Sequence, residues 1–532
     1  MSITDYLFPS GTPLKIWSRT LNANELDMMT KIVSLCKRRG FVFQSSEIYG
    51  GLKSAYDYGP LGVELKRNIA AAWWRSMVYE RDDIVGLDAS IVMHPKVWET
   101  SGHVSGFSDP LVDCLNCKER FRGDKAPAMA PGTEVVFIKG GKDKGEKIKG
   151  VVNSRGYVCP VCGSSELSEE RQFNGMFRTI LGPVDPMDEF FREIKGKDLS
   201  EKEMRGIYEG ITKNSLVYLR PETAQAMFVQ FLNVQQTTSQ KVPFGIAQQG
   251  KSFRNEITVE HFIFRSCEFE QMEMEYFIEP GTQGEWLKYW TDTRMGWYGL
   301  YSNKPDNFRL RQHDKDELAH YSDDCYDVEY LYPWGWGELE GVASRTDYDL
   351  KRHAAATGVK LSYFDQNKPD PDTGKMGWRY VPFVIEPAAG LTRTLLALLL
   401  DAYTEESGVD AEGKEKSRTF LKLHPSLAPV KAAILPLVKK DGQPEKADEI
   451  AKALRAAGLN VSLDEQQSIG KRYAKHDEIG TPFCITVDPD TMKDDTVTVR
   501  FRDTAEQTRM PITEAVKLVI EKVRHPAPGA KK

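Results

Sequence analysis

The amino-acid sequence predicts an α+β protein built on an antiparallel sheet, followed by a small α/β domain and carrying a cysteine-rich insertion. Three observations support this prediction. Strand-like and helical patterns mix irregularly over the first 426 residues. After residue 427, strands and helices alternate regularly. Two C-x2-C pairs lie within residues 112–168 and interrupt the first region.

The composition limits the class of protein. With 532 residues the chain exceeds the size of one hydrophobic core, so we expect two or three domains. A net charge of −6 argues against a strongly basic nucleic-acid-binding protein, although a local basic patch stays compatible with it. The longest apolar run, LLALLLDAY, contains Asp401 and is too short to span a membrane. The absence of a secretory pattern, together with eight cysteines, indicates a soluble protein of the reducing cytoplasm.

The elements of the first region follow in order. Residues 28–40 have helical periodicity and end on a glycine, and residues 59–81 predict an amphipathic helix that begins at a glycine. Residues 83–95 predict a strand closed by Pro95. Further strand-like runs, with helices between them, cover residues 217–220, 243–249, 261–277 and 380–386.

The small α/β domain covers residues 427–525. VKAAILPLV predicts a strand, EKADEIAKALRAAG a helix stopped by glycine, and NVSL a second strand. FCITVD and TVTVRFRD predict two further strands, and residues 512–523 an amphipathic helix. Residues 526–532 predict a disordered tail.

Four cysteines predict a metal site. Cys114 and Cys117 form one C-x2-C pair, and Cys159 and Cys162 form the second. Each short turn presents two thiolates on one side, which suits tetrahedral zinc. Four thiolates leave no open coordination position, so the predicted zinc is structural. Four free thiols stay the alternative, whereas a redox pair is disfavoured because no βαβ setting surrounds either motif.

The segment FRNEITVEHFIFRSCEFE, residues 253–270, mixes arginines, glutamates and phenylalanines. Arg254 and Glu256 lie two residues apart and would share one face of a strand, and Arg265 follows on the returning strand. Such a hairpin is either a solvated ladder of ion pairs or the floor of a site for a charged ligand. In a ligand site, arginines hold phosphate oxygens, and carboxylates hold an ammonium or orient a metal.

Other charged residues bear on this choice. Glu222 follows Pro221 at a strand-to-helix junction, where the alternative role of its carboxylate is to cap the helix. Glu338 and Arg345 fall in a predicted glycine-rich loop.

The segment YVPFVIEPAAGLTRTLLALLL decides in favour of a ligand. It predicts a strand bearing Glu386, a turn at residues 387–390 and an apolar helix with Arg393 in its first turn. An arginine is unfavourable there because the helix dipole favours anions at that end. A bound phosphate would remove this difficulty, so the charged segments together predict a site for a zwitterion and a polyphosphate.

These segments resemble those of the homodimeric type of glycyl-tRNA synthetase, a family of class II aminoacyl-tRNA synthetases, over residues 28–525. FRNE with FRSCEFEQMEMEYF is similar to motif 2, and EPAAGLTRTLLALL is similar to motif 3. AWWRSMVYERDDIVGLDASIVMHP corresponds to motif 1, which forms the dimer interface in that family. SSEIYGGLKSAYDYGPLG, RPETAQ, GELEG and RTDYDL are similar to segments specific to the glycyl family, and SIGKRYAKHDEIGTPFCITVD resembles its anticodon-binding domain.

The resemblance implies a cytoplasmic homodimer that uses ATP and Mg²⁺ to activate glycine as glycyl-adenylate and then acylates tRNA(Gly). It also implies a division of the chain. An N-terminal extension (1–27) precedes a catalytic domain (28–426) that contains the zinc-knuckle insertion (112–168), and an anticodon-binding domain (427–525) comes before the tail.

By the same resemblance, Arg254 holds the α-phosphate and the attacking carboxylate. Arg265 and Arg393 hold the distal phosphates, Phe269 stacks on adenine and Glu338 helps to place magnesium. The implied ATP site comprises Arg254, Asn255, Glu256, Phe264, Arg265, Phe269, Glu338, Leu339, Gly390 and Arg393, with Arg254, Glu256 and Arg393 catalytic. The implied glycine site comprises Arg122, Glu222, Glu273, Arg345, Glu386 and Ala388.

The chain departs from the family pattern at several positions. Ala388 stands where the family has serine, Ala226 where it has glycine, and Cys267 where it has a second arginine. Val259 and Glu260 replace a Pro-Arg pair. A lost hydrogen bond to a charged group costs about 1.5–3 kcal/mol if nothing replaces it. The core arginines and glutamates persist, so we expect a working enzyme, and the effect of the departures on affinity or fidelity stays open.

Two rival functions stay open. One is a class II synthetase for another small amino acid, such as serine or alanine, which the glycyl-specific segments oppose. The other is a non-enzymatic relative that binds nucleic acid, which the retained ATP-site residues oppose. For tRNA, the candidate contact surfaces are the lysine-rich loop 139–150 and residues 470–476, and either could instead be a plain solvated surface.

Overall fold

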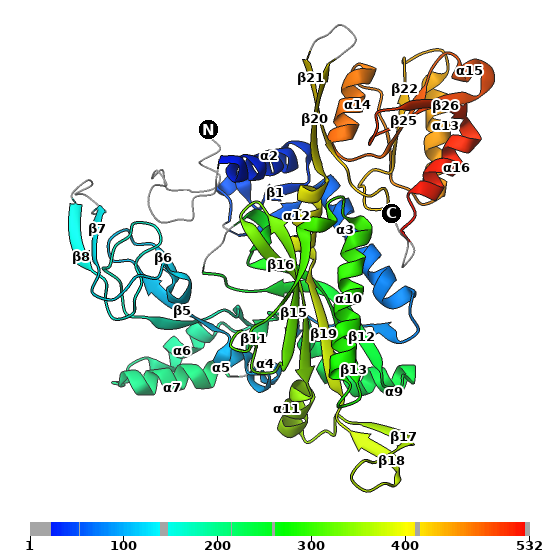
Figure 1. Ribbon diagram of the computed structural model, residues 1–532. Helices are drawn as coiled ribbons and strands as arrows, with labels where there is room; N and C mark the ends of the chain where they lie inside the picture. The colour runs from blue at the N-terminus through cyan, green and yellow to red at the C-terminus, as the bar shows by residue number, and fades with distance from the viewer. Residues whose placement is uncertain are drawn as a thin grey trace.

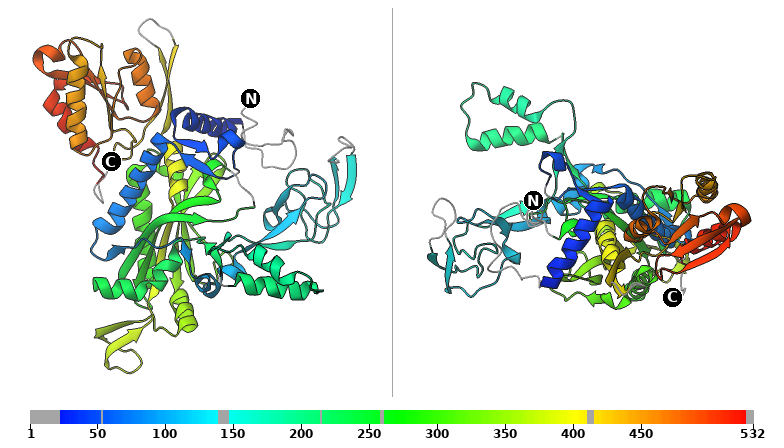
Figure 2. Two further views of the ribbon diagram at one scale, coloured as in Figure 1. Left: turned by 180° about the vertical axis from the view of Figure 1, so that it is seen from behind. Right: turned by 90° about the horizontal axis from the view of Figure 1, so that it is seen from above.

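A central sheet organises the computed structural model, with a cysteine-rich module on one side and a C-terminal α/β layer on the other (Figures 1 and 2). The structure describes residues 23–52, 54–138, 147–213, 215–257, 261–409 and 415–526. Four predictions therefore fall wholly or mainly outside the described residues: the N-terminal extension up to residue 22, the lysine-rich loop at 139–146, the departure at 259–260, and the tail from residue 527.

The central sheet has seven strands and is antiparallel, as predicted, except for the parallel pair of β12 and β3. Its strands in spatial order are β14 (Phe308–Gln312), β15 (Asp324–Tyr332), β16 (Gly335–Thr346), β19 (Phe383–Gly390), β13 (Glu268–Ile278), β12 (Phe244–Phe253) and β3 (Ile84–Gly86). The sheet therefore brings together segments that lie far apart in the sequence.

Successive side chains of β13 point to opposite faces of the sheet. Met272, Met274 and Tyr276 belong to the main hydrophobic core on one face. Phe277 joins a second apolar cluster on the other face, where Glu273 lines a pocket. The helices of the main core are α2 (Ala23–Arg39), α3 (Pro60–Trp74), α10 (Gln283–Tyr301) and α12 (Leu391–Ala402), and those near the second cluster are α8 (Ala224–Val229), α9 (Phe231–Thr238) and α11 (Tyr348–Thr357).

Helix boundaries follow local chemistry. Gly40, after α2, has a φ of 78°, a left-handed conformation that suits glycine at a helix end. The predicted helix at 59–81 is α3 followed by a short π-helix, η2 (Arg75–Tyr79), and Pro60 occupies the first turn of α3 where its missing N–H costs no hydrogen bond.

Two of the predicted strands are wrong in extent. Residues 83–95 form two short strands in different sheets, β3 and β4 (Val92–Met93), and Pro95 starts α4 (Pro95–Thr100). Residues 261–267 are not part of a strand: η5 (Phe262–Phe264) is a 3-10 turn, and β13 begins only at Glu268. The apolar residues of these stretches pack between neighbouring elements. In the sequence they look the same as the apolar residues of a strand.

Two segments predicted as irregular are strands. Glu338 and Arg345 lie on β16, because the glycines there give the backbone room beside neighbouring strands rather than turning it. Residues 387–390 continue β19 and do not turn. Pro387 lacks an N–H, and the pairing of β19 with β13 passes from Ala388–Glu273 directly to Ile385–Tyr276.

The predicted insertion at 112–168 lies within a longer run of short elements between α4 and α8. Its strands are β5 (Ser108–Asp113), β6 (Arg120–Arg122), β7 (Glu134–Ile138), β8 (Lys147–Val151), β9 (Arg171–Asn174), β10 (Arg178–Ile180) and β11 (Leu216–Leu219). Its helices are α5 (His103–Gly106), the 3-10 turn η3 (Gly123–Lys125), α6 (Pro186–Ile194) and α7 (Glu201–Thr212). Helix α7 was not predicted, although Ser200 and Glu203 at its start form a reciprocal capping box, a pattern that the sequence contains.

The C-terminal layer has the predicted α/β character. Its sheet order is β23 (Val461–Leu463), β22 (Ala432–Pro436), β24 (Phe483–Val487), β25 (Thr496–Phe501) and β26 (Gln507–Pro511). Its helices are α13 (Gln443–Ala456), α14 (Ile469–Glu478), α15 (Thr491–Asp494) and α16 (Ile512–Lys522). Helix α14 and strand β26 were not predicted, because polar residues dominate both.

Short elements complete the described chain. They are β1 (Val42–Gln44), η1 (Glu47–Tyr49), β2 (Tyr56–Tyr58), η6 (Pro305–Asn307), and the hairpins of β17 (Tyr363–Pro369) with β18 (Met376–Tyr380) and β20 (Tyr403–Val409) with β21 (Glu415–Leu421). Among the described helices, none combines the length and apolar character that a membrane span requires.

Candidate active site

A pocket of about 270 Å³ lies on the polar face of the central sheet. It takes side chains from β13, β15, β16 and β19, from the start of α12, and from the loop that follows β12. Of the residues predicted from the sequence, its lining includes Glu222, Arg254, Glu256, Phe264, Arg265, Phe269, Glu273, Glu338, Glu386, Ala388, Gly390 and Arg393. The structure thus gathers both charged sets around one space.

One half of the pocket is rich in arginine. Strand β12 ends at Phe253, so Arg254 and Glu256 follow the strand instead of sharing one of its faces. The Nε of Arg254 donates a hydrogen bond to the Pro221 carbonyl at 3.0 Å, and its guanidinium lies 5.3 Å from the Phe269 ring centre. Arg265 Nε lies 3.7 Å from a Glu256 oxygen. These contacts orient Arg254 before any ligand binds.

Arg393 occupies the first turn of α12, as predicted. Its Nη1 lies 3.1 Å from Glu338, its Nε donates to the Phe264 carbonyl at 3.2 Å, and its guanidinium lies 4.6 Å from the Phe264 ring centre. The Arg393 guanidinium lowers the pKa of Glu338. Burial opposes the charge on Arg393, but Glu338 and the surrounding groups raise its pKa overall. Glu338 is therefore the partner that offsets the unfavourable helix-dipole position.

The other half of the pocket is acidic. Glu273 accepts hydrogen bonds from the backbone N–H of Thr223, at 3.0 Å, and from its hydroxyl. Glu222 does not cap α8; it lies 3.2 Å from His103 and accepts from Gln225 at 3.1 Å. Contacts of Glu222 and Thr223, which precede α8, therefore fix the carboxylates of the acidic half.

Arg345 stands behind the acidic half and does not line the pocket. It is buried, with its Nη1 2.7 Å from Glu386 and its Nε 2.9 Å from Asp349. The Tyr321 ring covers the guanidinium at 4.0 Å. This buried pair fixes the position of Glu386.

Burial and mutual repulsion perturb the acidic carboxyls. Burial, then Glu386 and Glu222, raises the pKa of Glu273 well above its usual range. Burial also raises the pKa of Glu386, although Arg345 opposes this. Burial would raise the pKa of Glu222 as well, but His103 and Arg345 bring it well below its usual range. A buried group of carboxyls with too few cations is arranged to receive a cation.

Three other predicted residues are not in the pocket lining. Arg122 pairs with Asp109 and Asp124, each at 2.8 Å. Leu339 is 1% exposed and belongs to the main core, because it alternates with Glu338 along β16. Asn255 lies in the loop after β12, where its backbone N–H donates to the Gly175 carbonyl at 2.7 Å.

The departures from the family pattern fall in different surroundings. Ala388 lines the pocket and is paired with Glu273 across the strands. Ala226 is buried in α8. The Cys267 sulfur lies 3.0 Å from the Ser54 hydroxyl.

Several lining residues were missed by sequence reasoning. His313, Cys325 and Asp327 form a group whose ligand-type atoms lie within 4.8 Å of one another. His313 Nε2 is 2.8 Å from Asp327, whose pKa burial and Glu338 raise to about 6. The signal was present in DCYDVEYLY, where polar residues alternate along an otherwise aromatic and apolar strand. The other missed lining residues are Ser266, Gln271, Tyr321, Gly341, Ala343 and Thr392.

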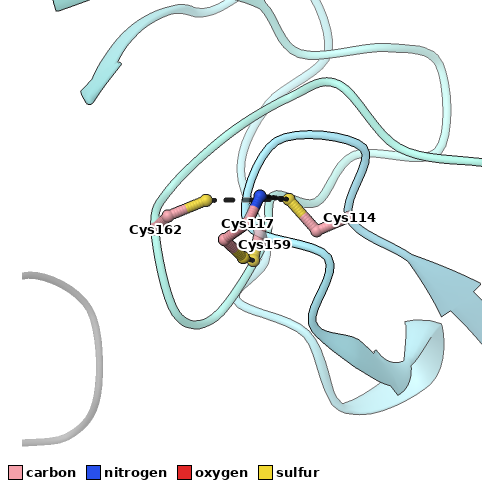
Figure 3. Close-up of side chains that lie close together, drawn as sticks. All are labelled: Cys114, Cys117, Cys159 and Cys162. Atoms are coloured by element: carbon pink, nitrogen blue, oxygen red, sulfur yellow. Dashed lines mark hydrogen bonds between the residues drawn. The ribbon is translucent and has the colours of Figure 1, made fainter. Parts of the chain in front are cut away.

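The two C-x2-C pairs meet in the cysteine-rich module (Figure 3). The sulfurs of Cys114 and Cys162 are 3.6 Å apart, and those of Cys117 and Cys159 are 3.7 Å apart. All four lie within 4.8 Å of one another, and no described cysteine is in a disulfide. Tetrahedral zinc with bonds of about 2.3 Å requires sulfur separations of about 3.8 Å, so the four thiols fit a zinc ion.

Comparisons with known proteins agree with this architecture. Residues 431–522 match the family described as an anticodon binding domain. A glycine–tRNA ligase of Treponema denticola is 47% identical over 497 residues, covering 93% of this chain and 97% of the relative. A glycine–tRNA ligase of Clostridium perfringens is 50% identical over 499 residues, covering 93% of this chain and 98% of the relative.

Solved structures share the fold at low sequence identity. A prolyl-tRNA synthetase of Giardia lamblia with prolyl-adenylate has a TM-score of 0.57 at 15% identity, covering 94% of this chain and 76% of the other. One of Cryptosporidium parvum with L-proline and AMP has a TM-score of 0.53 at 13% identity, covering 93% and 79%. At these identities the likeness establishes the class II fold, in agreement with the predicted fold class.

Proposed function

The chain belongs to the glycine–tRNA ligase family, and from that membership we propose how its pocket performs the family's reaction. It activates glycine with ATP and Mg²⁺, releases pyrophosphate, and transfers the glycyl group from the adenylate to tRNA(Gly). The observation that supports this reading best is one pocket with an arginine-rich half for a polyphosphate and an acidic half for an ammonium.

In the first step, an oxygen of the glycine carboxylate attacks the α-phosphorus of ATP, and the bond to pyrophosphate breaks. No protein nucleophile is required, so positioning and charge neutralisation supply the catalysis. We assign Arg254 to the α-phosphate and the attacking carboxylate, because its guanidinium is held over Phe269 and by the Pro221 carbonyl. Glu256 would keep Arg265 oriented toward the same space.

The remaining nucleotide contacts follow the pocket wall. Arg265 and Arg393 are assigned to the distal phosphates and Phe269 to the adenine ring. Glu338 would exchange part of its contact with Arg393 for the Mg²⁺ that accompanies the phosphates, since a carboxylate is a suitable ligand for that ion.

Glycine has no side chain to hold, so selection depends on its ammonium, its carboxylate and a closed pocket. We assign the ammonium to Glu222, Glu273 and Glu386, with Arg345 acting from behind on Glu386. Ala388 would lie beside the substrate, because it is paired with Glu273. Arg122 is assigned to the same site by the resemblance, and Asp124, then Asp109 and Glu256, raise the pKa of its guanidinium.

Outside the pocket, three further assignments belong to this proposal. Cys114, Cys117, Cys159 and Cys162 hold a structural zinc ion, which ties β5 to the chain around Gly163. The chain divides at residue 427 into catalytic and anticodon-binding domains, supported by the family match at 431–522. It works as a homodimer in the cytoplasm, as the resemblance of its motif 1 segment implies.

The test is glycine-dependent exchange of pyrophosphate into ATP, with alanine and serine as parallel substrates and no tRNA added. Exchange with glycine alone, followed by charging of tRNA(Gly), is the expected result. Exchange with alanine or serine would instead make the chain a ligase for another small amino acid. Binding of tRNA without any exchange would make it a nucleic-acid-binding relative.

A further inference from the structure

Glu275 is a buried glutamate to which the proposed substrate contacts assign no role. It lies on β13 and is fully buried. Neither of its carboxyl oxygens has a hydrogen-bond partner within the described part of the chain. An unpartnered carboxyl in a protein interior is costly, so its presence requires a physical reason.

On β13, Glu275 lies between a pocket-lining residue and a residue of the second apolar cluster. Alternation along β13 puts it on the same face as Glu273 and Phe277. Glu273 lines the pocket, whereas Phe277 belongs to the apolar cluster beneath it. Glu275 therefore lies at the boundary between the pocket lining and this apolar cluster.

The three carboxyls of this region are close enough to interact directly. One carboxyl oxygen from each of Glu273, Glu275 and Glu386 lies within 4.8 Å of the other two. The β13–β19 pairing skips from Glu273–Ala388 to Tyr276–Ile385, which leaves Glu275 and Glu386 facing each other outside the regular ladder. Glu386 is thus the residue of β19 that lies opposite Glu275.

The neighbouring elements supply too few cations to balance these carboxyls. The titratable groups that act on Glu275 are Glu386 on β19, Arg345 on β16, Glu273 on β13 and Asp349 on α11. Further out, Glu222, His103, Tyr321 and His353 interact with these groups or with one another. Arg345 is already engaged by Glu386 and Asp349.

Glu275 is the carboxyl best suited to stay neutral. Burial, then Glu386, raises its pKa well above the usual range. Glu273, in contrast, already accepts hydrogen bonds from Thr223, and Glu386 accepts one from Arg345. A neutral carboxyl carries one O–H donor, which an ionised one lacks.

We propose that Glu275 is a positioning residue for glycine: when glycine binds, its neutral carboxyl donates its hydrogen to the facing Glu386 and so directs the remaining lone pairs of Glu386 toward the glycine ammonium. The inference rests on the glycine site proposed above and adds a residue that acts through Glu386. An ionised Glu275 would repel both neighbours and draw the ammonium below the floor.

Two variants separate this role from a packing role. Glu275→Gln keeps the shape, the neutrality and a hydrogen-bond donor. Glu275→Met keeps similar bulk and removes the donor. Replacement of an unpartnered buried polar group by an apolar one is neutral or stabilising, so the methionine variant is expected to fold with an equal or higher melting temperature.

The measurement is pyrophosphate exchange by the full-length chain, with KM for glycine and for ATP determined separately. We expect Glu275→Met to raise the glycine KM by about tenfold or more, with the ATP KM unchanged, and Glu275→Gln to stay within about threefold of the unmodified chain. An unchanged glycine KM in Glu275→Met would overturn the inference. So would equal losses in both variants, or losses for ATP and glycine together with a lower melting temperature.

Glu273→Gln and Glu386→Gln serve as reference variants for the glycine site itself. Both are expected to raise the glycine KM. If neither does, the assigned glycine site is wrong and the inference falls with it. If both do while Glu275→Met stays normal, the glycine site stands and only the inference is overturned.

Discussion

Individual side chains in the pocket are held by the protein before substrate binds. Arg254 is held by a carbonyl and two aromatic rings, and Arg393 is held by a carbonyl and by Glu338. An arginine that is already ordered loses little further conformational entropy when it binds a phosphate. This arrangement suits a reaction that depends on fixed charges rather than on a protein nucleophile.

Ala388 is the departure from the family pattern with the most direct consequence for substrate binding. Its partner across the strands is Glu273, which is assigned to the glycine ammonium. We expect Ala388→Ser to lower the glycine KM by up to about tenfold, because the added hydroxyl offers a hydrogen bond to a charged group. The ATP KM should not change.

Pyrophosphate exchange with varied glycine checks this expectation, with alanine as the competing substrate. Ala226→Gly is the matched control, since Ala226 is buried in α8 outside the pocket lining. A glycine KM that rises in Ala388→Ser would mean that the alanine accommodates the substrate better than the hydroxyl does.

The cysteine-rich module around Cys114, Cys117, Cys159 and Cys162 has only a small apolar core. Its hydrophobic cluster consists of Val112, Phe121, Tyr157 and two of the four cysteines, with a few half-buried neighbours. Such a core is too small to be stable without a cross-link or a metal.

Zinc removal should therefore unfold this module selectively. Cys117→Ser is expected to lose most bound zinc and to expose the module to proteolysis, because three ligands hold zinc less firmly than four. Zinc content per chain by atomic emission and limited proteolysis measure both effects. Cys484→Ser, at a buried cysteine of the C-terminal sheet, should keep its zinc. Equal zinc content in both variants would contradict the site.

A second unusual buried group lies just before the first strand of the C-terminal layer. Lys431 precedes β22, is largely buried, and donates a hydrogen bond to the Ser426 carbonyl. Burial lowers its pKa to about 7. Between that value and its unfolded pKa the unfolded chain binds the extra proton, so stability should rise with pH through this window.

Lys431→Met tests this linkage. The buried charge is costly below about pH 7, so the variant should melt on the order of 5 °C higher there. The difference should shrink as the pH approaches about 10, where the lysine is neutral in both states. Melting curves across this range, with exposed Lys517→Met as the control, give the comparison. A constant difference at all pH values would refute the linkage.

The whole molecule combines the pocket of the central body with a C-terminal layer that matches an anticodon-binding domain. The C-terminal layer is joined to the central body by polar contacts, including Arg39 with Glu478 at 2.5 Å and Arg418 with Asp477 at 2.9 Å. Arg502 also donates to the Leu423 carbonyl at 2.7 Å. These contacts join the layer to the central body.

Charge reversal on the C-terminal layer should separate the two reaction steps. Lys471 is exposed on α14. Lys471→Glu is expected to raise the KM for tRNA several-fold and to reduce the salt dependence of binding by about one charge, with pyrophosphate exchange unchanged. Lys517→Glu, exposed on α16, is the control. An equal effect of both variants would indicate a general electrostatic attraction rather than a contact.

The sequence by itself was sufficient for the fold class, the family and most of the pocket lining. Those features depend on local patterns: alternation along β13, the glycine after α2, the C-x2-C pairs and the long charged segments. Periodicity and motif spacing are properties of the chain, so they can be read without coordinates.

Other features depend on how distant segments meet. Glu338 and Arg345 turned out to lie on a strand because β15 and β19 pair with it on both sides. Leu339 entered the core, and Arg345 was placed behind Glu386, since the sheet decides which face each residue takes. Glu275 has no hydrogen-bond partner among the described residues, and it lies opposite Glu386, a relation between two strands more than 100 residues apart that no local pattern encodes.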